Sequence, residues 1–85
     1  MKNVTIYTTG VCQYCKKAKE LLASEYQVTP EEFRVDGNVE KLKEMMDRTQ
    51  KSSVPQIFIG DTYVGGFDAL HELHTKGELA SLLQN

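Results

Sequence analysis

The sequence predicts an α/β fold, a four-stranded mixed sheet flanked by helices, with elements in the order β-α-β-α-β-β-α. Short β-branched runs alternate along the chain with stretches whose apolar residues fall at helical spacing. A strand–helix–strand unit makes a parallel pair with a right-handed crossover, whereas a loop as short as Gly60-Asp61 joins antiparallel neighbours. The length of 85 residues fits one domain, spanning residues 1–85.

Two strands are predicted in the first half of the chain, at Asn3–Thr8 and Glu31–Val35. Both are short and rich in residues that favour extended backbone. Because successive side chains of a strand point to opposite faces, Val4 and Ile6 should lie on one face and Tyr7 on the other.

Two helices are predicted around the second strand. The first begins near Tyr14 and ends near Tyr26, because Thr29-Pro30 disfavours helix. The second begins after Asn38, a good N-cap, and ends before Ser52-Ser53. Its apolar face is predicted to comprise Val39, Leu42, Met45 and Met46. Two ion pairs one turn apart are predicted on exposed helix faces, Lys16 with Glu20 and Glu44 with Arg48.

The second half begins with a hairpin whose strands span Gln56–Ile59 and Thr62–Val64. Gly60 at the first loop position suits a type II′ turn. A third helix opens at Phe67-Asp68 and has Gly77 as its C-terminal stop signal. A final short helix places three leucines on one side, Leu79, Leu82 and Leu83.

Charge and hydropathy exclude several classes of partner. Ten Lys and Arg residues against twelve Asp and Glu give a net charge of −2, without a basic block, so we expect no nucleic-acid partner. The apolar runs, such as Ile57-Phe58-Ile59, are too short to cross a membrane, and residues 1–6 lack the apolar stretch of a signal peptide. We therefore expect a cytoplasmic monomer with no membrane partner.

The strongest chemical signal is the motif Cys12-Gln13-Tyr14-Cys15. Cys12 stands where a loop enters a helix, and the unpaired N–H groups of a first helical turn stabilise a thiolate. The thiolate is the species that attacks disulfides. Cys15 can reach the Cys12 sulfur, so we interpret Cys12 as the nucleophile and Cys15 as the resolving thiol. The alternatives are inert thiols, or half a zinc site completed by His71 and His74.

A second feature is Val54-Pro55, between a predicted helix and a strand. If this peptide bond were cis, the backbone N–H and C=O of Val54 could face outward beside the sulfurs, where a cysteinyl peptide would pair with them. Because only about 5% of X-Pro bonds are cis, the residues alone favour the trans form.

A third feature is Gly65-Gly66, which ends a strand just before Phe67 and Asp68 open a helix. The free N–H groups of these two residues would form an anion site for a carboxylate, and the Asp68 side chain could meet an ammonium group. A ligand with an α-amino and an α-carboxylate group would satisfy both. The alternative is that Asp68 only caps the helix.

Together, three motifs resemble the glutaredoxins, most closely the short bacterial dithiol class. They are Cys12-Gln13-Tyr14-Cys15, Ser53-Val54-Pro55 and Gly65-Gly66-Phe67-Asp68. The resemblance covers essentially the whole chain and implies a thioredoxin-like fold with a cis Pro55. It also implies glutathione as co-substrate, with no tightly bound cofactor and no metal.

The resemblance implies a role for each site residue. The backbone of Val54 would pair with the cysteine of glutathione, Phe67 and Asp68 would hold its γ-glutamyl end, and Tyr14 would border the site. Recognition of the ammonium group would rest on Asp68 alone, because Ala69 stands where a second acidic residue is common. The predicted catalytic residues are Cys12 and Cys15. The predicted glutathione-binding residues are Tyr14, Lys51, Ser53, Val54, Pro55, Gly66, Phe67 and Asp68.

Two further positions depart from the pattern of that family. Gln13 replaces the proline of the usual C-P-Y-C motif, so the redox potential is open. Thr9 stands where many relatives carry a basic residue that helps the thiolate and the glycine carboxylate of glutathione. We favour Lys51 over Arg48 and Lys16 as its substitute, because Lys51 lies just before the proline motif.

The predicted function is a glutathione-dependent thiol–disulfide oxidoreductase that reduces glutathione mixed disulfides and protein disulfides through the Cys12/Cys15 dithiol. The predicted partners are glutathione and glutathionylated or disulfide-containing proteins, with ribonucleotide reductase among the candidates. One alternative is an electron donor reduced by thioredoxin reductase, against which the Gly65-Gly66-Phe67-Asp68 motif argues. The other is an iron–sulfur cluster carrier.

Overall fold

The sheet has the strand order β2-β1-β3-β4 in the computed structural model, which describes residues 1–84. β1 runs parallel to β2 and antiparallel to β3, and β3 runs antiparallel to β4. The predicted four-stranded mixed sheet is therefore confirmed. The strands are β1 (Val4–Thr8), β2 (Glu31–Arg34), β3 (Gln56–Ile59) and β4 (Thr62–Gly65).

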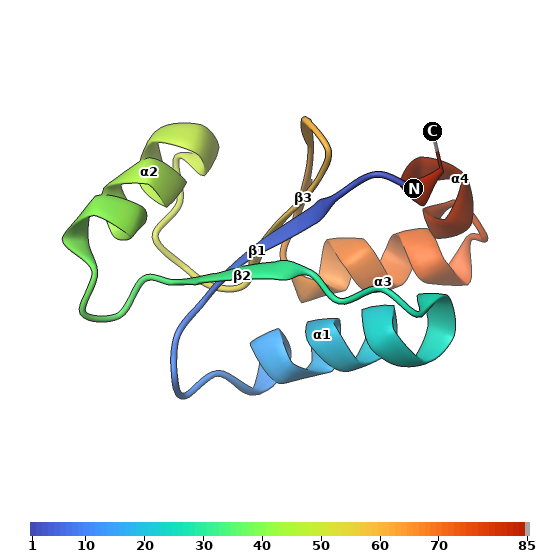
Figure 1. Cartoon of the computed structure of the whole chain (residues 1–85), viewed down its shortest axis with the longest axis horizontal. Helices are drawn as coiled ribbons and strands as arrows, with labels where there is room; N and C mark the ends of the chain where they lie inside the picture. Colours follow the sequence, from blue (N-terminus) through green and yellow to red (C-terminus); the bar gives the residue numbers. More distant parts are fainter. Residues whose placement is uncertain (85) are drawn as a thin grey trace.

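The helices cover both faces of this sheet. They are α1 (Gln13–Tyr26), α2 (Val39–Thr49), α3 (Phe67–Thr75) and α4 (Leu79–Leu83). Figure 1 shows α1 and α3 together on one face and α2 on the other. The N-terminal segment lies beside α4, where the Lys2 N–H donates to the Leu83 carbonyl at 2.8 Å. In residues 1–84, none of the helices combines the length and apolar character needed to cross a membrane.

The larger part of the core lies between the sheet and the pair α1 and α3. Val4 and Ile6 of β1 point into it, as the alternation of the strand predicts. Leu22 of α1, Leu70 of α3 and Leu79 of α4 are fully buried there. Burying each leucine side chain is worth roughly 2 kcal/mol, so this cluster fixes α1 and α3 side by side.

The smaller cluster, under α2, contains a polar network that the sequence did not predict. The buried Tyr7 donates its hydroxyl proton to the Glu44 carboxylate and accepts from Arg48 Nη1 at 2.9 Å. The Arg48 guanidinium lies 3.7 Å from the centre of the Phe58 ring. The predicted Glu44–Arg48 ion pair is therefore wrong, because both side chains turn to the Tyr7 hydroxyl. Burial raises the pKa of Tyr7, and the hydrogen bond from Tyr7 lowers the pKa of Glu44.

Two other predictions for helix surfaces are also wrong. Val39 and Met46 are 80% and 44% exposed, although their spacing predicts both on the apolar face of α2, whereas Met45 is fully buried. A helix that covers one end of a small sheet buries only a narrow stripe. Within the described residues no ion pair joins Lys16 to Glu20, which fits the small free energy of an exposed pair.

The predicted turns and caps are confirmed. Gly60 has a φ of 59° and Asp61 does not have a positive φ, as a type II′ turn requires. The Asn38 side chain caps α2 by accepting from the Lys41 N–H at 3.1 Å. Gly77, with a φ of 74°, follows the C-cap of α3.

Candidate active site

The two cysteines form a disulfide at the start of α1, with Cα atoms 5.3 Å apart. Cys12 is the N-cap residue, and its sulfur accepts a hydrogen bond from the Cys15 N–H at 3.1 Å. Cys12 is partly exposed, whereas Cys15 is 2% exposed. The first turn carries no acidic side chain that would oppose a negative sulfur. This arrangement is the one that an accessible nucleophile at Cys12 and a sheltered resolving thiol at Cys15 require.

The loop that presents Cys12 is held by a carboxylate from the end of β2. Asp36 accepts a hydrogen bond from the Gly10 N–H at 3.0 Å and pairs with both the Nε and the Nη2 of Arg34, at 2.8 and 2.7 Å. The hydrogen bond from the Arg34 guanidinium lowers the pKa of Asp36 well below its usual range, and the hydrogen bond from the Gly10 N–H makes the second largest contribution. Asp36 therefore keeps its charge even in acidic solution, and its hydrogen bond to Gly10 ties the loop to the end of β2.

Val54-Pro55 lies beside the disulfide, with the Val54 carbonyl oxygen 3.9 Å from the Cys12 sulfur. The peptide bond between the two residues is cis. The trans form favoured by the residues alone is therefore wrong, and the cis form implied by the family resemblance is confirmed. General frequencies of X-Pro bonds contain no information about this tertiary setting.

The N-terminus of α3 lies open at the same place. Gly66 is its N-cap residue, and no side chain makes a capping hydrogen bond there. Asp68 is exposed and lies inside the first turn, two residues after the N-cap position, so the alternative that Asp68 only caps the helix is wrong. The rings of Phe67 and Tyr14 lie 5.9 Å apart and connect the starts of α3 and α1. Unpaired N–H groups at such a helix start favour an anion.

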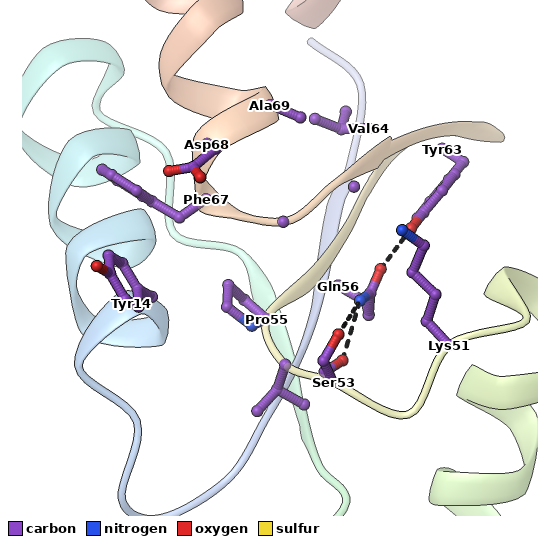
Figure 2. A pocket seen from close by; sticks show the side chains of 13 residues that line it. Tyr14, Lys51, Ser53, Pro55, Gln56, Tyr63, Val64, Phe67, Asp68 and Ala69 are labelled. Atoms are coloured by element: carbon purple, nitrogen blue, oxygen red, sulfur yellow. Dashed lines mark hydrogen bonds between the residues drawn. The ribbon is translucent and has the colours of Figure 1, made fainter.

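A pocket of about 550 Å³ lies next to the disulfide, and neither Cys12 nor Cys15 is among the residues that line it. Figure 2 shows the side chains of its lining. All of the residues predicted to bind glutathione line it: Tyr14, Lys51, Ser53, Val54, Pro55, Gly66, Phe67 and Asp68. The pocket thus brings the start of α1 together with residues 51–56 and 63–69, and it is lined by a cation on one side and a carboxylate on another.

Several residues of the pocket were not predicted, namely Gln56, Tyr63, Val64, Gly65 and Ala69. Gln56 carried a usable signal, since it is a polar residue at the start of a buried apolar strand. Tyr63 carried none, because an aromatic residue in an edge strand is common. Its place in the pocket depends on the pairing of β4 with β3.

The other candidate cations and the histidines lie elsewhere. Arg48 is held by Tyr7 and Phe58. Of the three candidate cations, Lys51 lines the pocket, and Arg48 and Lys16 do not. His74 accepts from or donates to the Tyr26 hydroxyl through Nδ1 at 2.6 Å, and the His71 ring lies 5.6 Å from that of Phe67. In residues 1–84, no three His, Cys, Asp or Glu side chains are grouped as a metal site would need.

Comparison with known proteins decides the family. The family model named Glutaredoxin matches residues 4–64. This chain belongs to the glutaredoxin family. Glutaredoxin 3 of Escherichia coli strain K12 is 45% identical to it over 84 residues, which cover 99% of this chain and all of that protein. The glutaredoxin of Neisseria meningitidis serogroup B is 46% identical over 83 residues, 98% of each chain.

Solved structures agree with this assignment. The solution structure of the glutaredoxin from Brucella melitensis has a TM-score of 0.84 and 42% identity, and the match covers 98% of this chain and 89% of that one. This glutaredoxin therefore has a thioredoxin-like fold and a redox-active cysteine pair. Its family and its Cys12–Cys15 disulfide make it a thiol–disulfide oxidoreductase.

Proposed function

We propose that this glutaredoxin uses glutathione, and that it reduces glutathione mixed disulfides and protein disulfides through Cys12 and Cys15. The observation that carries the proposal is the pocket in which Lys51, the backbone of Val54 and the open start of α3 converge beside the disulfide. Each of these features offers a contact to a different part of one small peptide.

Glutathione carries a thiol between two carboxylate ends, one of which also bears an ammonium group. Its cysteinyl backbone would pair with Val54 like an added strand. Its γ-glutamyl carboxylate would accept from the N–H groups of Phe67 and Asp68, and its ammonium group would face the Asp68 side chain. Lys51 would pair with the glycine carboxylate, while Tyr14, Ser53, Pro55 and Gly66 shape the walls.

The proposed reaction begins with the Cys12 thiolate. It attacks the glutathione sulfur of a mixed disulfide, the protein thiolate leaves, and Cys12 is joined to glutathione. The thiolate of a second glutathione attacks that sulfur, which gives oxidised glutathione and restores the Cys12 thiolate. With a protein disulfide, Cys12 forms a mixed disulfide with the substrate, and Cys15 then displaces the reduced protein. Two glutathione molecules afterwards reduce the Cys12–Cys15 bond.

The test is the reduction of a glutathionylated peptide, coupled to NADPH through glutathione reductase. A parallel assay replaces the glutathione system with thioredoxin reductase, and C12S is the control without a nucleophile. We expect turnover only with glutathione. Turnover only with thioredoxin reductase would contradict the proposal and favour an electron donor to enzymes such as ribonucleotide reductase. Turnover in neither assay would also contradict it and favour an iron–sulfur carrier, which visible absorbance after anaerobic purification would reveal.

A further inference from the structure

The side chain of Gln56 belongs to the pocket wall, and the proposed contacts with glutathione do not use it. It is 2% exposed at the start of β3. Its Nε2 donates to the Ser53 carbonyl at 2.9 Å and lies 3.3 Å from the Ser53 hydroxyl. Its Oε1 accepts from the Tyr63 hydroxyl at 2.5 Å. Figure 2 shows this chain of hydrogen bonds from β4 to the loop before Pro55.

The hydrogen bond from Gln56 to the Ser53 carbonyl fixes the orientation of the peptide between Ser53 and Val54. The cis peptide bond of this segment is the one between Val54 and Pro55, and the Ser53–Val54 bond is trans. In a planar trans peptide the C=O and the N–H point in opposite directions. Because the Ser53 carbonyl is held by Gln56, the Val54 N–H must face away from Gln56. Gln56 thereby sets the direction of the Val54 N–H. The carbonyl oxygen of the same residue lies 3.9 Å from the Cys12 sulfur.

Tyr63 sets the orientation of Gln56 in turn. A side-chain amide can rotate to exchange its oxygen and nitrogen, and only one orientation donates to Ser53. The Tyr63 hydroxyl donates to the oxygen and so favours that orientation. The Tyr63 ring is itself placed by Phe58, with ring centres 5.2 Å apart. Without the hydroxyl, a buried amide oxygen would lack its donor, which a folded protein avoids.

We infer that Gln56 and Tyr63 are positioning residues that aim the Val54 N–H at the backbone of a cysteinyl ligand, so that the site prefers peptide disulfides to disulfides without a peptide backbone. The inference rests on the proposed function, because it refines how that ligand pairs with Val54. Neither residue touches the reacting sulfurs. Their effect should therefore depend on what the substrate carries beside its disulfide.

The experiment compares two disulfides in a single step. In a C15S background, reduced protein is mixed with oxidised glutathione or with bis(2-hydroxyethyl) disulfide, and the mixed disulfide at Cys12 is followed by mass spectrometry after acid quenching. The Cys12 thiolate attacks one sulfur and releases one thiolate in both reactions. Only oxidised glutathione has a backbone that can accept from Val54.

Y63F should lower the rate constant with oxidised glutathione about fivefold, the factor that one hydrogen bond of ordinary strength supplies. The rate constant with bis(2-hydroxyethyl) disulfide should stay within about twofold. Q56E keeps the shape of the side chain and still accepts from Tyr63, but it cannot donate to Ser53. It should therefore lower the rate constant with oxidised glutathione, relative to that with bis(2-hydroxyethyl) disulfide, more than Y63F does. The matched control is Y26F, which removes a hydroxyl bonded to His74 at 2.6 Å outside the pocket and should change neither rate.

An equal fall of both rates in Y63F and Q56E would overturn the inference, because it would indicate general loosening of the site. Unchanged rates with oxidised glutathione would overturn it as well. Wild-type Cys12 that reacts with neither disulfide would contradict the proposed function itself, and the inference would fall with it. A fall confined to oxidised glutathione supports the positioning role.

Discussion

The N-termini of α1 and α3 lie at the same pocket, and the two helices are capped differently. At α1 the sulfur of Cys12 is the cap and accepts from the Cys15 N–H at 3.1 Å. At α3 the N-cap residue is Gly66, which has no side chain that could cap the helix. Both ends present unpaired N–H groups and a partial positive charge. In the proposed function, the start of α1 stabilises the Cys12 thiolate, and the start of α3 binds a carboxylate of glutathione.

This difference divides chemistry from recognition. A group that must react is held covalently at the helix start, where its negative form is stabilised on every cycle. A group that must bind and leave finds the same electrostatics without a competing side chain. The acidic Asp68 in the first turn of α3 is exposed, whereas the first turn of α1 has no acidic residue. The two starts can thus be changed separately.

The largest expected effects come from substitutions of the two cysteines at the start of α1. C12S should abolish reduction of glutathione mixed disulfides and of protein disulfides, because a serine hydroxyl is not ionised at neutral pH. C15S should retain reduction of glutathione mixed disulfides and lose that of protein disulfides, since only the latter needs a resolving thiol. The coupled NADPH assay measures both. Complete loss of both reactions in C15S would contradict the assigned roles.

Substitutions at the start of α3 should change KM for glutathione rather than kcat. D68N removes the charge opposite the ammonium group of glutathione, and we expect KM to rise about fivefold, the value of about 1 kcal/mol for an exposed ion pair. A glutathione derivative acylated at its amino group supplies the control, because it has no ammonium group to lose. The proposed contact is refuted if D68N weakens that derivative as much as glutathione.

A smaller effect should follow when α3 is given a cap of its own. G66S introduces a hydroxyl that can accept from the first N–H groups, at a φ of −90° that any residue adopts. A Cβ there would lie 3.5 Å from the Pro55 carbonyl oxygen, an ordinary contact. We expect a gain of a few tenths of a kcal/mol, about 0.3, in unfolding free energy. KM for glutathione should rise about twofold to threefold, because the cap competes with the ligand carboxylate.

Urea unfolding and steady-state kinetics of G66S measure these two effects. G66A is the matched control, since it adds the same Cβ without a capping oxygen. It should leave KM nearly unchanged. An equal rise of KM in G66A would assign the effect to steric crowding and not to capping.

The smallest effect on activity should come from α2, which contributes stability and no proposed ligand contact. The hydrogen bond from Tyr7 lowers the pKa of Glu44 below its ordinary value of 4.5. A carboxyl whose pKa is lower in the folded state stabilises the protein above its unfolded pKa, and this contribution disappears as the pH falls through the folded pKa. E44Q should therefore lose less than about 1 kcal/mol at pH 7 and show a weaker loss of stability below pH about 4.5.

Urea unfolding of wild type and E44Q between pH 7 and pH 3 gives the comparison. The rate of the coupled assay at neutral pH should be the same in both proteins, because Glu44 does not line the pocket. A large fall in activity would mean that the α2 side of the sheet is linked to the site after all.

Local patterns were sufficient for the strands, the helices and most caps. Alternation placed Ile6 and Tyr7 on opposite faces, and Asn38 and Gly77 marked helix ends, because these signals act between residues close in the chain. The same patterns failed for Glu44 and Arg48. Their spacing allowed an ion pair, but Tyr7, 37 residues away from Glu44, offered a better partner inside the fold.

The sequence by itself predicted which residues carry the proposed chemistry, since a cysteine at one helix start and a glycine pair before another helix are local features with local electrostatics. Only the tertiary structure decided how they work together. The cis bond before Pro55 and the meeting of Lys51 and Asp68 at one pocket were implied by the family resemblance and by no local pattern, and the link from Tyr63 through Gln56 to Ser53 was not predicted at all. Those choices depend on strand pairing and burial between distant segments, which no local pattern contains.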